Sequence, residues 1–127
     1  MNAPVSHPTY HGTCHCGAVR FQLTAELEPA ARCNCSLCRR KGAAMSAAFP
    51  KAQLQILAGE DQLSLYQFNS KVARHFFCKT CGIYPFHQTR KDPGLWRVNL
   101  GCLDGVDVFA LEVGRNDGAS LSVVTDA

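Results

Sequence analysis

Closely spaced cysteines constrain this chain more than any other feature of its sequence. There are eight in 127 residues, namely Cys14, Cys16, Cys33, Cys35, Cys38, Cys78, Cys81 and Cys102. Seven of the eight stand in clusters in which only one or two residues separate neighbouring cysteines. Such spacing gathers thiolates around a metal ion, whereas structural disulfides usually join distant parts of a secreted chain. We therefore predict that these clusters bind metal.

The three clusters read CxC, CxCxxC and CxxC along the chain, so they offer two, three and two ligands. A structural zinc ion takes four protein ligands in a tetrahedron. The first and last clusters together supply four, and the predicted structural site is Cys14, Cys16, Cys78 and Cys81. Gly17 and Gly82 each follow the last cysteine of a pair. A positive φ at glycine lets backbone N–H groups turn toward the sulfurs.

The middle cluster supplies three thiolates, and three ligands with an open position are typical of a catalytic zinc. We therefore predict a second zinc, two per chain, held by the catalytic residues Cys33, Cys35 and Cys38. The basic run 39–41 that follows offsets the thiolate charge and attracts an anionic substrate. Two alternatives stay open: closure of a second structural site by Cys102, and an iron–sulfur cluster, which takes the same ligands.

Apolar residues alternate with polar ones along most of the chain, which indicates β-strands. The predicted strands cover 19–24, 43–49, 54–57, 63–68, 72–77, 83–87, 95–100 and 106–113. One short helix is predicted after Cys35, over Leu37 to Lys41. The expected fold is mainly β, with antiparallel strands stapled by the structural zinc and one short helix.

The length predicts one domain, which we place at residues 11–113. A flexible N-terminus, 1–10, precedes it, and a C-terminal tail, 114–127, follows it. No apolar run approaches the ~18 residues of a membrane span, and no apolar signal region is readable near Met1. We therefore expect a cytoplasmic protein without a membrane partner. A net charge of +3 does not require nucleic acid as a partner.

The order CxCG, CxCxxC, CxxCG resembles the glutathione-dependent formaldehyde-activating enzyme family. The similarity extends past the cysteines, over Cys14 to Phe21, Cys35 to Gly42, Tyr66 to Asn69 and His75 to Ile83. The last two stretches and Cys102-Leu103-Asp104 resemble in particular the branch similar to centromere protein V. The likeness covers roughly residues 10 to 113, nearly the whole predicted domain.

This resemblance implies an antiparallel β fold around a structural zinc. It also implies a carbon–sulfur lyase that reversibly joins a thiol, usually glutathione, to formaldehyde as S-(hydroxymethyl)glutathione. By position, the first and last clusters match the family's structural site, and Cys33, Cys35 and Cys38 match its catalytic site. His75 and His87 are candidate acid–base groups near the open site.

A second function class is a zinc-stapled module that binds nucleic acid or protein without catalysis. Its basis is a set of scattered cations and aromatic residues: the run 39–41, Lys71, Arg74, Arg90, Arg97, Tyr84 and Trp96. Phosphate contacts would make the affinity of such a module steeply dependent on salt concentration, and an enzyme for a small thiol would not show this slope.

Overall fold

The computed structural model describes residues 7–68 and 70–117. Its strands are β1 (Thr9–Thr13), β2 (Arg20–Thr24), β3 (Ala30–Cys33), β4 (Phe49–Pro50), β5 (Leu54–Ala58), β6 (Leu63–Tyr66), β7 (Arg74–Cys78), β8 (Phe86–Gln88), β9 (Leu95–Val98) and β10 (Val113–Asn116). One short helix, α1 (Cys38–Lys41), and three 3-10 turns, η1 (Lys51–Gln53), η2 (Glu60–Gln62) and η3 (Leu100–Cys102), join them. None of the helices in the described part is long and apolar enough to span a membrane.

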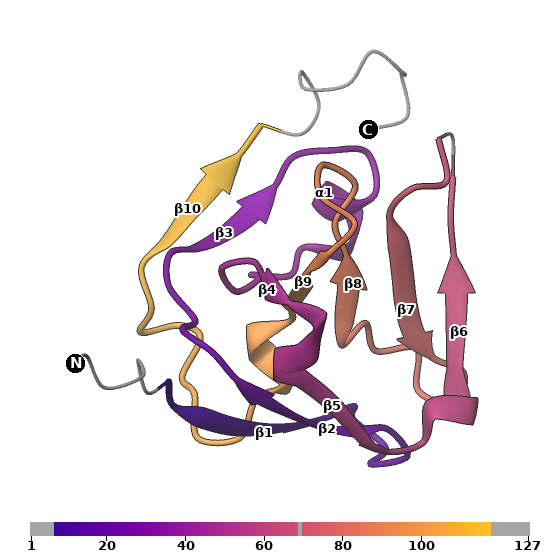
Figure 1. The fold of residues 1–127 in the computed structure, drawn as a ribbon. Helices are drawn as coiled ribbons and strands as arrows, with labels where there is room; N and C mark the ends of the chain where they lie inside the picture. The colour runs from indigo at the N-terminus through magenta and orange to yellow at the C-terminus, as the bar shows by residue number, and fades with distance from the viewer. Residues whose placement is uncertain (1–6, 69, 118–127) are drawn as a thin grey trace, which may run out of the picture.

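The strands form three sheets, and antiparallel pairing dominates, as the alternation predicted. A three-stranded sheet runs β1-β2-β5, and a five-stranded sheet runs β4-β9-β8-β7-β6. Figure 1 shows the first along one side of the molecule and the second opposite it. The remaining pair, β3 and β10, is parallel, which the sequence did not predict. The mainly β fold with one short helix is confirmed.

The core lies between the two larger sheets and follows from the period-two pattern of their strands. In β2, Phe21 and Leu23 are buried while their polar neighbours are more accessible. On the facing sheet, Phe86 packs its ring edge-to-face against Phe21, with 5.4 Å between the ring centroids. Such aromatic pairs contribute ~0.5–1.5 kcal/mol beyond the area they bury. This contact fixes the two sheets, and hence the cysteine clusters they carry, relative to each other.

Two segments that the pattern predicted as strands have other structures. Within 43–49 only Phe49 lies in a strand, although Met45 makes isolated bridges to Ala31 and Asn99. Within 106–113 the chain turns instead. The carboxylate of Asp107 accepts a hydrogen bond from the N–H of Phe109, so a local turn replaces the ladder bonds of a strand.

The regular structure reaches beyond both predicted limits of the domain. β1 begins at Thr9, which pairs with Thr24 of β2. β10 continues to Asn116, which pairs with Cys33 of β3. The rest of the predicted tail, 118–127, and residues 1–6 of the predicted flexible N-terminus lie outside the described residues.

Candidate metal centres and the adjoining pocket

The structure brings together the four cysteines of the first and last clusters. Cys14 and Cys16 lie in the turn between β1 and β2, Cys78 ends β7, and Cys81 lies in the turn that follows. Their four sulfur atoms all lie within 4.8 Å of one another. The group therefore links one end of the three-stranded sheet to the five-stranded sheet, with Cys16 and Cys78 separated by 62 positions in the sequence.

The spacing of these sulfur atoms fits a tetrahedral metal ion. Sγ of Cys16 lies 3.6 Å from Sγ of Cys14 and 3.7 Å from Sγ of Cys78. A tetrahedron with Zn–S bonds of ~2.3 Å requires sulfurs roughly 3.8 Å apart. A disulfide requires sulfurs about 2.0 Å apart, and all eight cysteines, each within the described residues, are unbridged. This donor set fits zinc.

Backbone N–H groups point at the sulfurs, as the glycine positions predicted. Gly17 and Gly82 have positive φ values of 83° and 79°. The N–H of Val19 donates to Sγ of Cys14 over 3.3 Å. The N–H of Ile83 is the main cause that lowers the pKa of Cys81 to about 6. These donors favour the thiolate form, which is the form that binds metal.

The middle cluster forms a second group beside α1, at the opposite end of the molecule from the turn between β1 and β2 (Figure 1). Cys33 ends β3, Cys35 lies in the following turn, and Cys38 begins α1. The N–H of Cys38 donates to Sγ of Cys35, and the N–H of Cys35 donates to Sγ of Cys33. The three sulfurs lie within 4.8 Å of one another, and no fourth Cys, His, Asp or Glu within 7–68 and 70–117 joins them at that distance.

Close approach of these three thiols disfavours their ionisation when no cation balances them. The thiols of Cys33 and Cys35, together with burial, raise the pKa of Cys38. A divalent cation would reverse this effect, because metal-bound thiols are deprotonated. The three-sulfur set thus fits an ion with one open position, and zinc is the metal whose catalytic sites have that pattern.

Cys102 lies in η3 and belongs to the hydrophobic core. Burial raises the pKa of its thiol to about 12, and Cys14 and Cys81 add to that shift, whereas none of the middle cluster contributes. Its sulfur is also not among those that lie within 4.8 Å of one another in the middle cluster, so Cys102 does not close the second site. Its surroundings are those of a small buried apolar residue.

We expect Cys102→Ala to leave both metal ions bound, because the substitution removes a core thiol and no ligand. The melting temperature should fall by a few degrees, the usual effect of a small core cavity. Metal content by elemental mass spectrometry checks this. A loss of one ion per chain would show that Cys102 is a ligand and that the second site is a closed, structural one.

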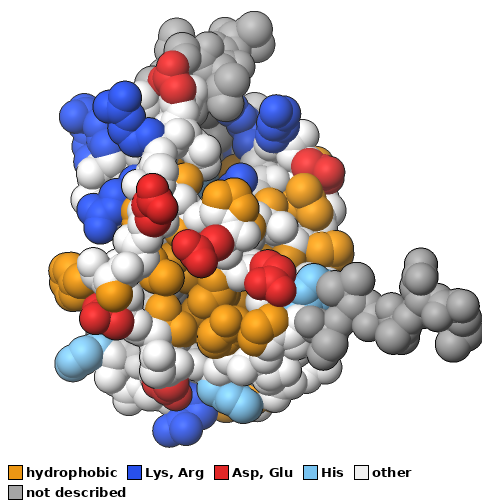
Figure 2. Space-filling view, turned by 90° about the vertical axis from the view of Figure 1, so that its left-hand side faces the viewer, with side chains coloured by type: hydrophobic (Ala, Val, Ile, Leu, Met, Phe, Trp, Pro, Cys, Tyr) orange, Lys and Arg blue, Asp and Glu red, His pale blue; other side chains and the backbone are white. Residues whose placement is uncertain are grey.

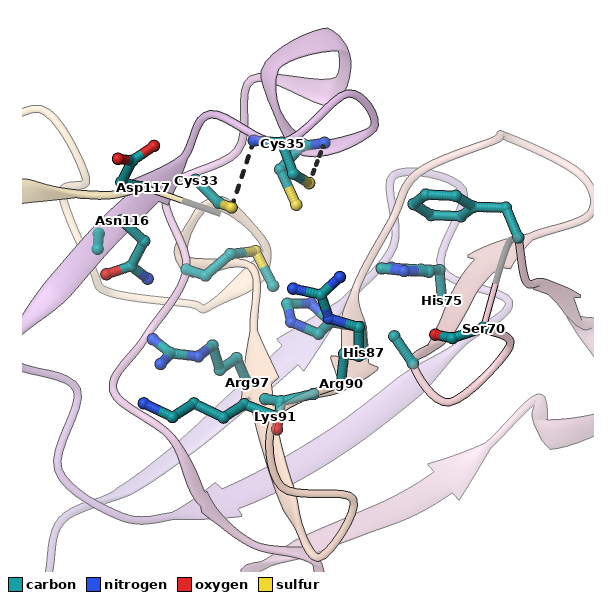
Figure 3. A pocket seen from close by; sticks show the side chains of 16 residues that line it. Cys33, Cys35, Ser70, His75, His87, Arg90, Lys91, Arg97, Asn116 and Asp117 are labelled. Carbon is teal, nitrogen blue, oxygen red and sulfur yellow. Dashed lines mark hydrogen bonds between the residues drawn. The ribbon is translucent and has the colours of Figure 1, made fainter. Parts of the chain in front are cut away.

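A pocket of about 280 Å³ adjoins the three-cysteine group. This volume is close to the lower end of the range for small-molecule sites, ~300–1,000 Å³. The lining of interest comes from separate elements: Cys33, Cys35, Cys38, His75, His87 and Arg97. Figure 3 shows the cysteines at one side of the pocket, His87 near its middle and His75 opposite Asn116.

One row across the five-stranded sheet supplies the polar wall of this pocket. His75 of β7 pairs with His87 of β8, and His87 pairs with Arg97 of β9. Directly paired residues share one face of a sheet. The alternate row, Phe76, Phe86 and Val98, belongs to the opposite face and packs into the core. Because successive side chains of a strand point to opposite faces, the apolar residues of these strands face the core and the ionisable ones face the pocket.

Both histidines of this row are neutral at neutral pH. Burial lowers the pKa of His75 to about 4, and burial lowers the pKa of His87 well below its usual value. His87 is 8% exposed, and its Nδ1 is buried without a hydrogen-bond partner among the described residues. Neutral imidazoles can accept as well as donate hydrogen bonds, which suits them to proton transfer.

The cations that line the pocket are not the ones the sequence indicated. Arg39 and Arg40 are exposed, and Arg40 donates to the carbonyl oxygen of Ser36. The pocket is lined instead by Arg90, Lys91 and Arg97. The expectation that the run 39–41 receives the substrate is therefore corrected. Arg39 and Arg40 lie on the exposed side of α1, whereas the loop after β8 and the strand β9 face the cavity.

Lys41 differs from its two neighbours because its ammonium group is buried. Its Nζ lies 3.4 Å from the centroid of the Tyr84 ring. Burial lowers its pKa to about 8, against the opposing effect of the three thiols of the middle cluster. Lys41 is thus the member of the run that offsets the charge of this cluster, as predicted for the run as a whole.

Several pocket residues carried no clear signal in the sequence. Asn116 and Asp117 reach the site because β10 pairs in parallel with β3, a pairing the sequence did not predict. Phe68 and Ser70 reach it from the connection between β6 and β7. The row of His75, His87 and Arg97 could have been predicted from the sequence, because each of them lies at an alternate position of a predicted strand.

Known proteins match this chain in sequence and in structure. The family model described as glutathione-dependent formaldehyde-activating enzyme matches residues 9–113. A putative glutathione-dependent formaldehyde-activating enzyme of Halomonas elongata is 35% identical over 79 residues, which are 55% of this chain and 50% of that protein. The chain thus matches about half the length of this relative. A crystal structure of a Rhodobacter sphaeroides protein has a TM-score of 0.78 and 43% identity, and the match covers 84% of this chain and 99% of that one.

Proposed function

Because this chain belongs to the glutathione-dependent formaldehyde-activating enzyme family, we propose that it is a zinc-dependent carbon–sulfur lyase acting on a thiol–aldehyde adduct. The reaction is the reversible joining of glutathione to formaldehyde as S-(hydroxymethyl)glutathione. We assign the structural zinc to the four-cysteine group and the catalytic zinc to Cys33, Cys35 and Cys38. The further likeness to the centromere protein V branch stays a prediction.

One observation carries the proposal: three clustered thiols open into the same pocket as two neutral imidazoles and three cations. A thiol–aldehyde addition needs a place for the sulfur, a donor for the developing alkoxide and a path for one proton. When bound, zinc would lower the pKa of a thiol or polarise a carbonyl. The pocket residues would hold the two reactants side by side, which makes the addition effectively unimolecular.

The charge of the pocket favours an anionic thiol such as glutathione, which carries two carboxylates and one ammonium group. Arg97 is half-buried, and its Nη1 donates to the carbonyl oxygen of Ser46 over 3.2 Å, so its guanidinium is held in place. Arg90 and Lys91 lie beside it in the loop after β8, and Asp117 lies across the pocket (Figure 3). This distribution of charge complements such a tripeptide.

A cytoplasmic location is part of the same proposal. All eight cysteines are unbridged in the described structure, and thiols of this number persist reduced where glutathione is abundant.

The direct test is an assay of the purified protein with glutathione and formaldehyde, run beside its metal content. We expect formation of the adduct above the uncatalysed rate and two zinc ions per chain. If the fully metal-loaded protein forms the adduct only at the uncatalysed rate, the enzyme proposal is wrong. Salt-dependent binding of nucleic acid by the same sample would then favour the binding module.

We expect Arg97→Gln to raise the KM for glutathione at least tenfold while kcat stays within about twofold, because a charge-assisted hydrogen bond contributes ~1.5–3 kcal/mol. The strand should remain in place, because β9 keeps its backbone pairing with β8 and β4. Steady-state kinetics at varied glutathione checks this. Arg39→Gln is the matched control, since it removes a cation next to Cys38 that does not line the pocket. An equal rise of KM in both variants would contradict a specific role for Arg97.

The nucleic-acid alternative finds no support on the face drawn in Figure 2. Among the described residues there, most Lys and Arg side chains lie toward the upper end and others at the lower end, while hydrophobic and acidic side chains occupy the middle and interrupt any basic stripe. A protein that tracks a phosphate backbone usually presents a continuous basic stripe or patch.

A further inference from the structure

A series of side-chain contacts connects the protein interior with the pocket. The hydroxyl group of Tyr84, the residue two before β8, hydrogen-bonds to Nδ1 of His75 on β7. The His75 ring stacks on Phe68 at one side, with 5.8 Å between centroids, and lies 5.4 Å from the His87 ring at the other. Its position is therefore fixed by a hydrogen bond and by two ring contacts. Figure 3 shows the His75 ring extending toward the middle of the pocket.

The direction of the hydrogen bond follows from what each partner would otherwise leave unpaired. Tyr84 is desolvated, as the upward shift of its pKa on burial indicates, and His75 Nδ1 is the one partner its hydroxyl has within the described structure. If Nδ1 carried the proton, the phenol proton would be a buried donor without an acceptor, which is energetically unfavourable. If the phenol donates, its proton is paired with Nδ1, and the remaining N–H of the imidazole faces the pocket.

Donation by the phenol places the imidazole proton on Nε2. No described residue hydrogen-bonds to Nε2 of His75, and His75 lines the pocket. The proton of Nε2 is therefore available to a bound molecule. A histidine whose tautomer is set by a hydrogen bond at one nitrogen presents a defined group at the other.

We propose that Tyr84 is a positioning residue that holds His75 in the Nε2–H tautomer, and that His75 donates this N–H to the aldehyde-derived oxygen of the substrate. The proposal rests on the lyase function proposed above. It adds a donor for the oxygen, contributed by the sheet rather than by the cysteine clusters.

The step is balanced without any further reactant. In the direction of synthesis, an electron pair of the thiol sulfur forms the C–S bond, and the C=O π pair moves onto oxygen. The proton lost by the thiol ends on that oxygen, and His75 keeps its own proton throughout. A preorganised donor at a developing oxyanion typically contributes ~10²–10³-fold to the rate.

Lys41 is the innermost residue of this series of contacts, next to Tyr84. Its ammonium group lies over the face of the Tyr84 ring, 3.4 Å from the centroid. A cation over an aromatic ring attracts its electrons and so makes the phenol a better hydrogen-bond donor. This contact favours the same direction of donation, from Tyr84 to His75.

The test combines a tautomer measurement with a mutant cycle on the metal-loaded protein. Two-dimensional ¹H–¹⁵N spectra of the imidazole ring should show His75 protonated at Nε2 and not at Nδ1. Tyr84→Phe should lower kcat about tenfold with KM nearly unchanged. His75→Leu should lower kcat at least as much. His75→Gln should recover part of the activity, since its amide places an N–H donor near the position of Nε2.

The cycle separates positioning from a merely structural role. In the His75→Gln background, Tyr84→Phe should cost no further activity, because the donor no longer depends on a tautomer. An equal loss in both backgrounds, or a His75 protonated at Nδ1, would overturn the proposal. Tyr10→Phe, on β1, is the matched control and should keep full activity. Metal content and melting temperature show whether each variant is folded.

Failure of this inference is distinguishable from failure of the lyase function. If the parent protein turns over the adduct and Tyr84→Phe equals it, only the role of Tyr84 is lost. If the parent protein does not turn over the adduct, the lyase function falls, and the step assigned to His75 falls with it. The spectra then still decide the tautomer.

Discussion

Cys81→Ser should prevent the chain from reaching its native fold at 37 °C. A structural zinc site contributes free energy on the order of 10 kcal/mol to folding, and the whole stability of a small domain is ~5–15 kcal/mol. Cys81 is half-buried, so a serine hydroxyl can be solvated there. The expected loss therefore comes from the ligand and not from packing.

The geometry of the site explains why the loss is global. The four-cysteine group joins the turn after β1 to the turn after β7, which belong to different sheets. The buried members, Cys14 and Cys78, pack with Val19 in a small cluster of their own. Without the metal, this end of the core keeps only that small cluster and the partly buried Ala18, Leu63 and Ile83 that pack against it.

Circular dichroism during heating, run beside elemental analysis, checks the prediction. Cys81→Ser should show no cooperative transition above room temperature and less than one zinc ion per chain. Cys102→Ala, which also removes one thiol, should melt close to the parent protein. A cooperative transition in Cys81→Ser near that of the parent would show that the structural role belongs to the other cluster.

The sequence predicted the local features that depend on residue type and spacing. Alternation in residues 20–24 predicted β2, because burying Phe21 and Leu23 leaves the residues between them accessible. The short helix over 37–41 is also present, as α1. Glycine after each CxC or CxxC pair predicted the positive φ of Gly17 and Gly82. These features need no knowledge of distant parts of the chain.

The features that the sequence did not predict depend on how distant strands meet. β10 pairs in parallel with β3, which brings Asn116 next to the cysteine cluster. Nothing in the local pattern of either strand distinguishes a parallel neighbour from an antiparallel one. The register that aligns His75, His87 and Arg97 has the same origin. Local patterns therefore did not predict the polar wall of the pocket, although each of its members lies in a predicted strand.

The basic run shows the same limit in a single stretch of three residues. Arg39, Arg40 and Lys41 are adjacent in the sequence, yet only the ammonium of Lys41 turns inward, over Tyr84. A helix turns its residues about 100° apart, so three neighbours cannot all face one cavity. The number of basic residues that follow a cysteine cluster in the sequence therefore overestimates how many of them lie close to its sulfur atoms.

Cys33→Ser should remove most of the activity and leave the fold intact, whereas Cys81→Ser should unfold the chain. Cys33 is the half-buried member of its cluster, whereas Cys35 and Cys38 are buried, so a serine hydroxyl is best tolerated at position 33. Only two thiolates would then remain for the second metal, and that ion should be lost.

The expected loss in kcat/KM is about a hundredfold or more, since a metal ion supplies several kcal/mol of transition-state stabilisation and ~1.4 kcal/mol is tenfold in rate. Elemental analysis should give one zinc per chain in place of two, with a melting temperature within a few degrees of the parent protein. Arg39→Gln serves as the nearby control, with unchanged metal content and rate. A variant that keeps two zinc ions and full activity would remove Cys33 from the catalytic site. Unfolding of the variant would show instead that this cluster is structural. A metal that serves only the reaction can be lost without unfolding the chain, because the core around Phe21 and Phe86 lies on the other face of the sheet.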